Sequence, residues 1–233
     1  MASADRVSEL VAYFEEQILS GQLAPGALLP SERAISLERG VSRSVVREAI
    51  SRLASMGLVR SIHGSGTRVQ APTGQPIART LQQLLRQGEV QLTQIAEVRL
   101  PLETAIARSA ALHRNDDHLH RLEVAQQHLA DPSASLESQV AADLQFHVVL
   151  AEASGNPLFG LVLGPIQHLL IESRRRTLGR HGSQLAHAHH AAILEAVRRR
   201  DPLAAESAMR RHLEANFQHL VAESAPTDEL ESS

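Results

Sequence analysis

The sequence has no cysteine, no tryptophan and no lysine, and it has only one tyrosine and four phenylalanines. The absence of cysteine excludes disulfide bonds and thiolate metal sites, and it is compatible with a reducing compartment. Because aromatic residues make up 2% of the 233 residues, hydrophobic cores must be built from Leu, Ala, Val and Ile. This composition favours helices packed through aliphatic side chains, in one large domain or two modest ones.

Long apolar runs are also absent, since no stretch approaches eighteen consecutive apolar residues. We therefore expect no membrane span. The N-terminal sequence MASADRVSEL has no apolar signal core, so we expect a mature N-terminus and a cytoplasmic protein. The net charge of -3 does not decide for or against nucleic acid, because DNA binding needs only a locally basic face.

A locally basic segment does exist. Residues 31–70 contain seven arginines against three glutamates, a balance of +4 within an acidic chain. All 23 basic side chains of the protein are arginines. The planar guanidinium is the side chain best shaped to bind phosphate and guanine, so this segment is a candidate DNA-binding region.

The N-terminal third has the pattern of three helices followed by a hairpin. Residues 6–20 carry an apolar helical stripe, and Ser31 and Ser42 are typical N-caps of two further helices that end at Gly40 and Gly57. The β-prone runs LVRSI and TRVQ flank the turn HGSG. This order predicts a winged helix-turn-helix over residues 1–70.

The rest of the chain is almost entirely helix-periodic. The segment APTGQP at 71–76 has two prolines and a glycine and is expected to be a linker. We expect an all-helical bundle over 77–224 and a polar tail at 225–233, so the fold class is mostly α. The expected helices lie near 77–87, 92–113, 115–130, 135–154, 158–178, 184–200 and 202–222.

The third helix begins with side chains suited to DNA. Arg43 and Arg47 are four residues apart and share an exposed face, while Ser42 and Ser44 are small enough for close approach and can donate to phosphates. In a helix-turn-helix the second helix presents its N-terminal residues to base edges in the major groove. A solvated charged face is the alternative. His63 and Gly64 occupy the hairpin tip, where a wing could enter the minor groove.

The run LAPGALLPSERAISLERGVSRSVVREAISRLASMGLVRSIHGSGTRV resembles the winged-helix signature of the GntR family, and the resemblance covers roughly residues 7–70. It implies a homodimer that binds near-palindromic double-stranded operator DNA. The residues that it implies in DNA contact are Arg33, Ser42, Arg43, Ser44, Arg47, His63 and Gly64.

A metal site is predicted in the helical region. Asp143 and His147 are four residues apart, which places a carboxylate and an imidazole side by side on one helix face. Alone this pair is weak evidence, because satisfied polar pairs are commoner than metal ligands. His190 and His212 each lie eleven residues from Asp201, at the turn between the last two helices. At about 1.5 Å per residue both are roughly 16 Å from the turn, so they are level on neighbouring helices.

One carboxylate and three imidazoles suit a divalent transition metal, of which zinc is the first expectation and nickel, cobalt, iron or manganese also fit. An octahedral ion would keep two positions for water or a ligand carboxylate. His189 competes with His190, but only His190 shares a face with Ile193, Leu194 and Val197. The other histidines are expected to be surface residues or non-ligands: His113, His118, His120, His128, His168, His181, His187 and His219.

This region also resembles the FCD domain, the helical effector domain of the FadR subfamily of GntR regulators. The resemblance covers about 77–222 and rests on EVRLPLE at 97–103, DLQFHVVLAEASGNP at 143–157 and HAAILEAVRRRDPLAAESAMRRHL at 190–213. It implies that Asp143, His147, His190 and His212 are metal ligands and that a small organic acid binds at or near the metal. It also implies that Arg99 pairs with an effector carboxylate; a structural salt bridge to Glu103 is the alternative.

The expected function is therefore a transcription regulator, by default a repressor, whose DNA binding responds to an organic acid. Two alternatives remain at this point. A metal-dependent hydrolase or lyase could use the His-rich site, because a metal with open positions can activate water. A regulator with a purely structural metal would melt in a metal-dependent way but would show no response of its DNA binding to small molecules.

Overall fold

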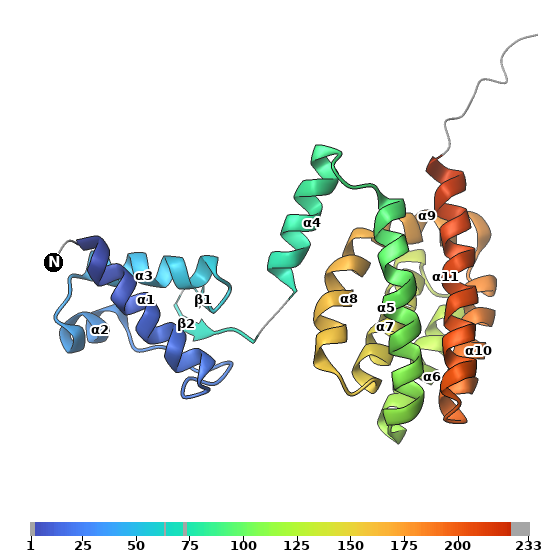
Figure 1. Cartoon of the computed structure of the whole chain (residues 1–233), viewed down its shortest axis with the longest axis horizontal. Helices are drawn as coiled ribbons and strands as arrows, with labels where there is room; N and C mark the ends of the chain where they lie inside the picture. Colours follow the sequence, from blue (N-terminus) through green and yellow to red (C-terminus); the bar gives the residue numbers. More distant parts are fainter. Residues whose placement is uncertain (1–2, 63, 72–73, 225–233) are drawn as a thin grey trace, which may run out of the picture. The chain divides into compact units, whose positions relative to one another are not determined.

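The computed structural model describes residues 3–62, 64–71 and 74–224, so His63 and the expected polar tail at 225–233 lie outside the described residues. The chain divides into two compact units, Met1–Pro76 and Ile77–Ser233 (Figure 1). In the described residues the fold class is the expected one, since helices predominate in both units and the first unit adds a small two-stranded hairpin.

The N-terminal unit has the predicted order of elements. Its three helices are α1 (Ser3–Leu19), α2 (Glu32–Arg39) and α3 (Arg43–Ser55). They are followed by the antiparallel strands β1 (Val59–Ile62) and β2 (Gly66–Val69), in which Val59 pairs with Val69. The winged helix-turn-helix prediction is thus confirmed.

Local sequence explains the helix boundaries in this unit. The Ser31 hydroxyl accepts a hydrogen bond from the Ala34 amide, and the Ser42 hydroxyl accepts one from the Val45 amide, at 3.2 and 3.4 Å. These contacts satisfy backbone donors that a helix start leaves free. Gly40 ends α2 with a φ of 62°, a left-handed conformation that glycine adopts without a Cβ clash. The short turn so formed brings α3 across α2.

The core of the N-terminal unit is aliphatic, as the composition requires. It is formed by the inward faces of all three helices and by the first residue of β1. Its buried members include Val7, Phe14, Leu29, Ile35, Val46, Ala49, Leu53 and Val59. Since the buried side chains of α3 point into this core, the opposite, polar face of α3 is exposed and can contact a binding partner.

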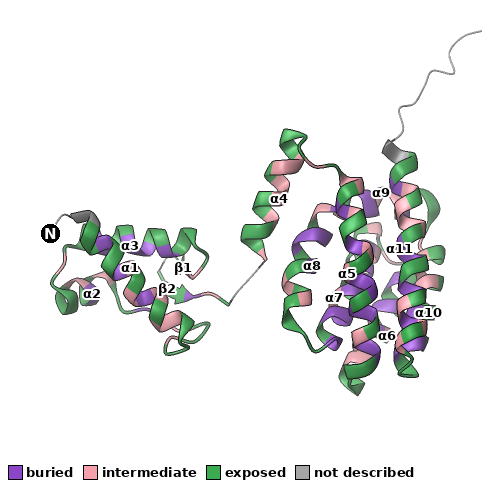
Figure 2. Cartoon of the chain, in the orientation of Figure 1, coloured by how far each residue is buried: buried purple, intermediate pink, exposed green. Residues whose placement is uncertain are grey.

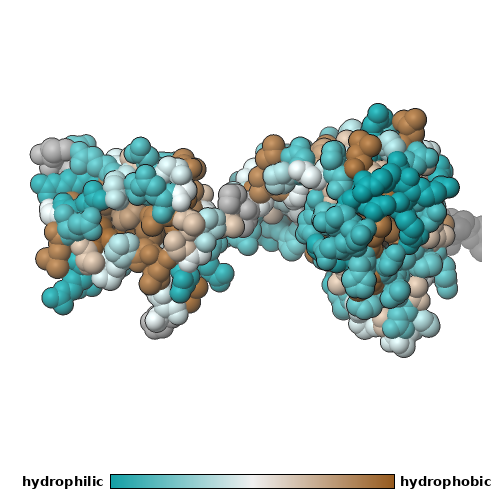
Figure 3. Space-filling view, turned by 90° about the horizontal axis from the view of Figure 1, so that it is seen from below, coloured by the Kyte–Doolittle hydropathy of each residue, from teal (hydrophilic) through white to brown (hydrophobic). Residues whose placement is uncertain are grey.

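The C-terminal unit consists of helices. Their bounds are α4 (Gln75–Gln87), α5 (Leu92–His113), α6 (Asp116–Ala130), α7 (Leu136–Ala153), α8 (Pro157–Leu169), α9 (Ile171–His181), α10 (Gln184–Arg198) and α11 (Pro202–Ser224). Helix α5 packs along α11, and α6 packs along α7. The buried residues of α5, α7 and α8 face the inside of the bundle (Figure 2), whereas the face of this unit seen in Figure 3 is mostly hydrophilic.

One expectation about element boundaries is wrong. The helix expected at 158–178 is two helices, because the backbone at Leu170 leaves helical geometry with φ of -97° and ψ of 0° and ends α8. Helix α9 then continues to His181. The linker expected at 71–76 runs directly into α4, whose first turn contains its last two residues, because proline is compatible with the first helical turn that Pro76 occupies.

The turn between α10 and α11 has the predicted geometry. The Asp201 carboxylate accepts a hydrogen bond from the Ala204 amide at 2.9 Å, and Pro202 is the first residue of α11. The Arg200 guanidinium donates to the carbonyl groups of Leu112 and Arg114, which ties this turn to the end of α5. The two helices are thereby held antiparallel at a defined register.

The core of the C-terminal unit lies between these helices. It includes Ile106, Leu122, Phe146, Leu150, Leu163, Ile193 and Met209, all nearly inaccessible to solvent. Among the helices of residues 3–62, 64–71 and 74–224, none combines the length and apolar character that crossing a membrane requires.

Candidate DNA-binding surface and buried histidine site

The exposed start of α3 presents the predicted arginines. Arg43 and Arg47 have 67% and 68% of their side chains exposed. Each lies just under 4 Å from a carboxylate oxygen of Glu32 on α2, at 3.8 and 3.9 Å. Exposed ion pairs of this length are weak, so both guanidinium groups remain available to DNA. The hydroxyl groups of Ser42 and Ser44 lie 2.8 Å apart beside them.

Two other predicted contacts are also exposed. Arg33 lies in the first turn of α2, and Gly64 lies in the hairpin turn with a φ of 76°. Arg60 and Arg68 stand opposite each other on β1 and β2, and both are exposed. These two strand arginines add positive charge to the wing. They were not selected as contacts from the sequence, although their place in the two β-prone runs was visible.

Three histidines meet inside the C-terminal unit. His147 comes from α7, His190 from α10 and His212 from α11, and each is at most 1% exposed. One nitrogen atom from each ring lies within 4.8 Å of the others. The level placement of His190 and His212 follows from the α10–α11 turn, at which the Asp201 side chain caps the start of the second helix.

Neighbouring side chains orient these rings. The Phe146 ring stacks on His190 with a centroid distance of 4.1 Å and an interplanar angle of 7°. His147 Nδ1 lies 2.5 Å from Glu103 Oε2, within ion-pair range, although the ring N–H is not aligned for a hydrogen bond. Glu103 in turn accepts a hydrogen bond from Arg99 Nε at 2.5 Å. A carboxylate behind a ligating histidine commonly fixes its ring and its tautomer.

Arg99 therefore forms the salt bridge with Glu103 that was the alternative to effector binding. Both side chains are buried. Although burial acts to raise it, Arg99 and His147 together hold the pKa of Glu103 well below its usual value. Glu103 is accordingly an anion that compensates positive charge next to the histidines.

Burial also sets the charge of the histidines. It holds the pKa of His190 and His212 well below the usual value of 6.5, and for His212 the positive charge of neighbouring groups acts in the same direction. Both rings are therefore neutral near pH 7. A neutral imidazole is the form that binds a metal ion.

The unsatisfied atoms of the cluster fit a cation. Within the part of the chain that the structure describes, Nε2 of His147, both ring nitrogens of His190 and Nδ1 of His212 have no hydrogen-bond partner, while Nδ1 of His147 faces the Glu103 carboxylate. Buried polar atoms without a partner cost free energy, so native proteins usually satisfy them. A divalent transition metal held by three neutral imidazoles would satisfy one nitrogen of each ring.

Asp143 lies at the edge of this cluster and has another partner. Its carboxylate accepts hydrogen bonds from Arg174 Nε and Nη2, at 2.8 and 3.0 Å, and its Oδ1 lies 3.6 Å from His190 Nε2. Although burial acts to raise it, Arg174, His190 and His147 hold the pKa of Asp143 below its usual value. The structure thus groups the three predicted histidine ligands, and it places the Asp143 carboxylate at their edge, bound by an arginine.

Arg174 on α9 was missed by the sequence reasoning. It is buried, and beyond Asp143 it donates to Asn216 Oδ1 at 2.7 Å. The available signal was its spacing, because Leu170 and Leu178 lie four residues before and after it and are both buried. An arginine in the apolar stripe of a helix needs a buried partner.

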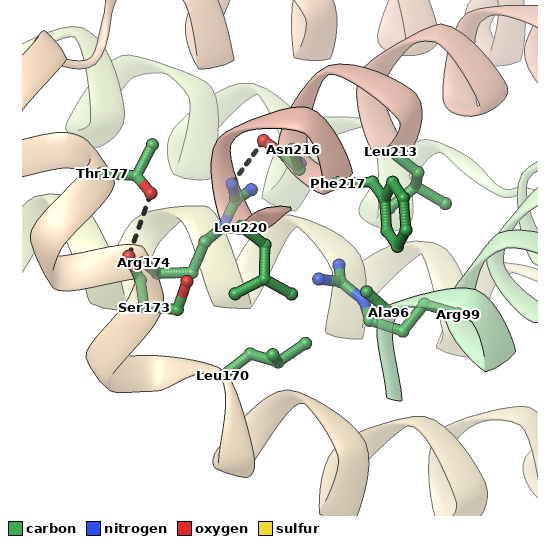
Figure 4. Close-up of a pocket in the computed structure, with 10 residues that line it drawn as sticks. All are labelled: Ala96, Arg99, Leu170, Ser173, Arg174, Thr177, Leu213, Asn216, Phe217 and Leu220. Carbon is green, nitrogen blue, oxygen red and sulfur yellow. Dashed lines mark hydrogen bonds between the residues drawn. The ribbon is translucent and has the colours of Figure 1, made fainter. Parts of the chain in front are cut away.

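A small cavity of about 30 Å³ adjoins the cluster, lined by residues of α5, α9 and α11. Arg99 and Arg174 both line it, and Figure 4 shows their side chains reaching toward it from α5 and α9. Ser173, Thr177 and Asn216 add polar groups to its wall. Arg99 therefore forms its salt bridge and also faces a cavity.

The other histidines lie outside the cluster. His189 is partly exposed, and its ring centroid lies 5.7 Å from that of His212. The histidines expected at the surface of α5 and α6 are exposed or partly exposed: His113, His118, His120 and His128.

Comparison with known proteins places both units. The model of the family "Bacterial regulatory proteins, gntR family" matches residues 6–69, and the model of the FCD domain matches residues 94–215. The HTH-type transcriptional regulator LutR of Bacillus subtilis is 34% identical over 202 residues, which cover 84% of this chain and 92% of LutR. The HTH-type transcriptional repressor NanR of Cronobacter sakazakii is 33% identical over 224 residues, which cover 91% of this chain and 84% of NanR.

A solved structure agrees with these matches. The structure described as Streptococcus agalactiae GntR aligns with a TM-score of 0.71 at 26% identity, and covers 91% of this chain and 99% of that one. The matched families and relatives are transcription regulators and not enzymes, which sets the hydrolase or lyase hypothesis aside. The chain therefore belongs to the GntR family of bacterial regulatory proteins, as a DNA-binding transcription regulator that carries an FCD domain.

Proposed function

We propose that the protein is a repressor whose operator binding is controlled by a small organic acid bound at a metal site in the C-terminal unit. One observation carries this proposal: three buried histidines with unpaired nitrogens adjoin an arginine-lined cavity. The name of the relative NanR, a transcriptional repressor, supports the sign of regulation.

His147, His190 and His212 would hold a divalent transition metal, with the Asp143 carboxylate as a fourth ligand. Zinc is the first candidate, and nickel, cobalt, iron and manganese also suit three imidazoles and a carboxylate. When bound, the metal would supply a fixed positive charge that attracts the carboxylate of an acid. Glu103 holds His147 from behind and compensates part of this charge.

Arg99 would bind the effector at the cavity wall. Its Nε is engaged by Glu103, and the residue also lines the cavity, so it can face an anion without leaving its salt bridge. Hydrogen bonds between a guanidinium and a carboxylate are among the strong ones in proteins. Arg99 therefore combines a structural role with a role in ligand binding.

The N-terminal unit would bind operator DNA in the cytoplasm as one half of a homodimer. The proposed contacts are Arg33, Ser42, Arg43, Ser44, Arg47, His63 and Gly64. We assign residues 1–70 to DNA binding, 71–76 to the linker, whose last two residues begin α4, and 77–224 to effector binding and dimerisation. A two-fold symmetric dimer matches a near-palindromic operator, because each helix-turn-helix reads one half-site.

The acid would regulate the protein by binding more tightly to one arrangement of the dimer than to the other. Coupling between two sites is a free-energy difference, typically about 1–3 kcal/mol, which corresponds to a change of roughly 5- to 150-fold in affinity. A shift of this size in DNA affinity is large enough to control transcription.

A gel shift with the upstream region of the protein's own gene tests this function. The metal-loaded protein is mixed with that DNA at low salt, with and without a panel of small carboxylic and sugar acids. We expect a shifted band that one acid weakens. A shifted band that responds to none of the acids, together with melting that depends on metal, would instead support a purely structural metal.

A further inference from the structure

We propose that Arg174 and the bound metal compete for Asp143, and that metal binding releases the Arg174 guanidinium to bind the effector. The released group would form, with Arg99, a site for an acid that carries two carboxylates. This inference rests on the metal site of the proposed function. It adds a residue that determines both metal affinity and ligand choice.

Arg174 is held by hydrogen bonds to two side chains. Its Nε and Nη2 donate to the two carboxylate oxygens of Asp143, and its Nη1 donates to Asn216 Oδ1. The side chain is buried. Paired donation from a guanidinium to a carboxylate is a strong contact. Both oxygens with which Asp143 could bind a metal are therefore engaged by a cation of the protein itself.

Arg174 and the metal would need the same atoms. Arg174 Nη2 lies 3.0 Å from Asp143 Oδ1 and 3.4 Å from His212 Nε2. A divalent ion bound to Asp143 and the histidines would repel the guanidinium at such short range. It would also draw the carboxylate away from Arg174. A buried guanidinium without an anion is strongly unfavourable, so Arg174 would need a new partner.

A small cavity lies beside Arg174. Its volume of about 30 Å³ leaves room for little more than one or two water molecules, so an organic acid needs a side chain to move. Both arginines line the cavity, but Arg99 stays anchored by Glu103. Arg174 would lose its partner Asp143 to the metal, so it is the side chain that can move. Figure 4 shows Arg174 between the Asn216 side of the cavity and Ser173 on its own helix.

The charges around the cavity indicate which ligand would bind there. A divalent metal with Arg99 and Arg174 brings four positive charges, and Asp143 with Glu103 brings two negative ones. An imidazole that holds a metal is neutral, so the three histidines add no charge. Two positive charges remain uncompensated in a buried site. A small dicarboxylate would neutralise them, with the carboxylates divided between the metal and the two guanidinium groups.

Metal affinity is the first test, measured by calorimetric titration of chelator-treated full-length protein with zinc. Arg174→Gln removes the competing cation, so we expect it to bind zinc about tenfold or more tightly than wild type. The control is Arg175→Gln on the same helix, since Arg175 is ion-paired with Glu137 and Glu172 away from the cluster, and its zinc affinity should not change.

Equal or weaker zinc binding by Arg174→Gln would overturn the competition. A wild-type protein that binds neither zinc nor another divalent transition metal would overturn the metal site itself, which is a separate failure. If circular dichroism shows that Arg174→Gln does not fold without metal, Arg174→Lys takes its place. That variant keeps a cation but removes the paired donation to Asp143, and it should raise zinc affinity by a smaller factor; an unchanged or lower affinity would again overturn the competition.

Ligand choice is the second test. Zinc-loaded wild type is titrated with acids of matched chain length, namely malonate against propionate, succinate against butyrate and glutarate against valerate. We expect at least one dicarboxylate to bind about tenfold or more tightly than its partner, and Arg174→Gln to lose that preference. No preference in wild type, or an equal preference in the variant, would overturn the assignment of Arg174 to the effector.

Discussion

Arg43 and Arg47 expose about two thirds of their side chains at the start of α3, where a recognition helix meets base edges. Replacing either with alanine should weaken operator binding by about 1–3 kcal/mol, because that is the usual contribution of a guanidinium that pairs with guanine. Fluorescence anisotropy with labelled operator DNA measures the change. Arg52→Ala is the control, since Arg52 lies in the last turn of α3 and pairs with Glu48. Equal losses in all three variants would contradict a specific role for the helix start.

Glu103 is the residue through which His147 is held. Glu103→Gln keeps the shape but removes the charge that compensates Arg99 and orients the ring. Loss of such a supporting group typically lowers metal affinity by about 10- to 100-fold. Calorimetric titration with zinc checks this, and the exposed Glu97→Gln on the same helix is the control. Unchanged zinc affinity in Glu103→Gln, with the fold intact by circular dichroism, would show that His147 does not depend on Glu103.

Helix α7 joins the core to the site, because Phe146 is fully buried and also stacks on His190. Phe146→Ala should lower the free energy of unfolding by about 3–5 kcal/mol, the usual cost of deleting a buried aromatic ring. Phe146→Leu keeps most of the volume and should lose less. Urea unfolding of chelator-treated protein followed by circular dichroism measures both. If the alanine variant loses less than about 1 kcal/mol of unfolding free energy, the neighbouring side chains must fill the space that the ring leaves.

The elements and part of the site were predictable because they depend on local patterns. Serine caps and glycine stops mark α2 and α3, and the equal distances of His190 and His212 from Asp201 place them level on two antiparallel helices. These relations need only helix geometry and one turn. The position of Asp143 one turn before His147 was predictable for the same reason.

Other features depend on packing between elements far apart in the sequence. The pairing of Arg174 with Asp143 joins α9 to α7, and no spacing rule links residues 31 positions apart on separate helices. The break at Leu170 is also tertiary, since the flanking residues are apolar and helix-compatible, and Leu170 is buried in a cluster with Ile95 and Ile166. The arginine partner of the predicted carboxylate ligand was invisible for this reason.

The stability of the whole molecule should depend on pH in a defined direction. Because burial holds the pKa of His190 and His212 below 6.5, the unfolded chain takes up protons there that the folded chain does not. Protons therefore favour unfolding, and stability falls as pH drops below about 6.5. Burial remains the largest influence on the pKa of His190, ahead of the charged or titratable groups near it, Asp143, His147, Arg174 and Glu103.

Melting temperatures of chelator-treated protein, from about pH 8 to about pH 5, measure this effect. Asp143 and Glu103 have lowered pKa values, so the stability that these two carboxylates contribute to the folded protein is lost only at more acidic pH, below about 4. His190→Asn should reduce the slope between pH 6.5 and pH 5, and the exposed His128→Gln should not. A flat profile down to about pH 4 would contradict neutral buried histidines.

The central claim is that an acid controls DNA binding through the buried histidine site. The most direct measurement is the dissociation constant for operator DNA, by fluorescence anisotropy, of metal-loaded protein titrated with the acid that acts in the gel shift. For wild type and His128→Ala we predict that the acid raises this constant about fivefold or more, and for His190→Ala that it leaves it unchanged. An equal response of His190→Ala and wild type would contradict control through this site.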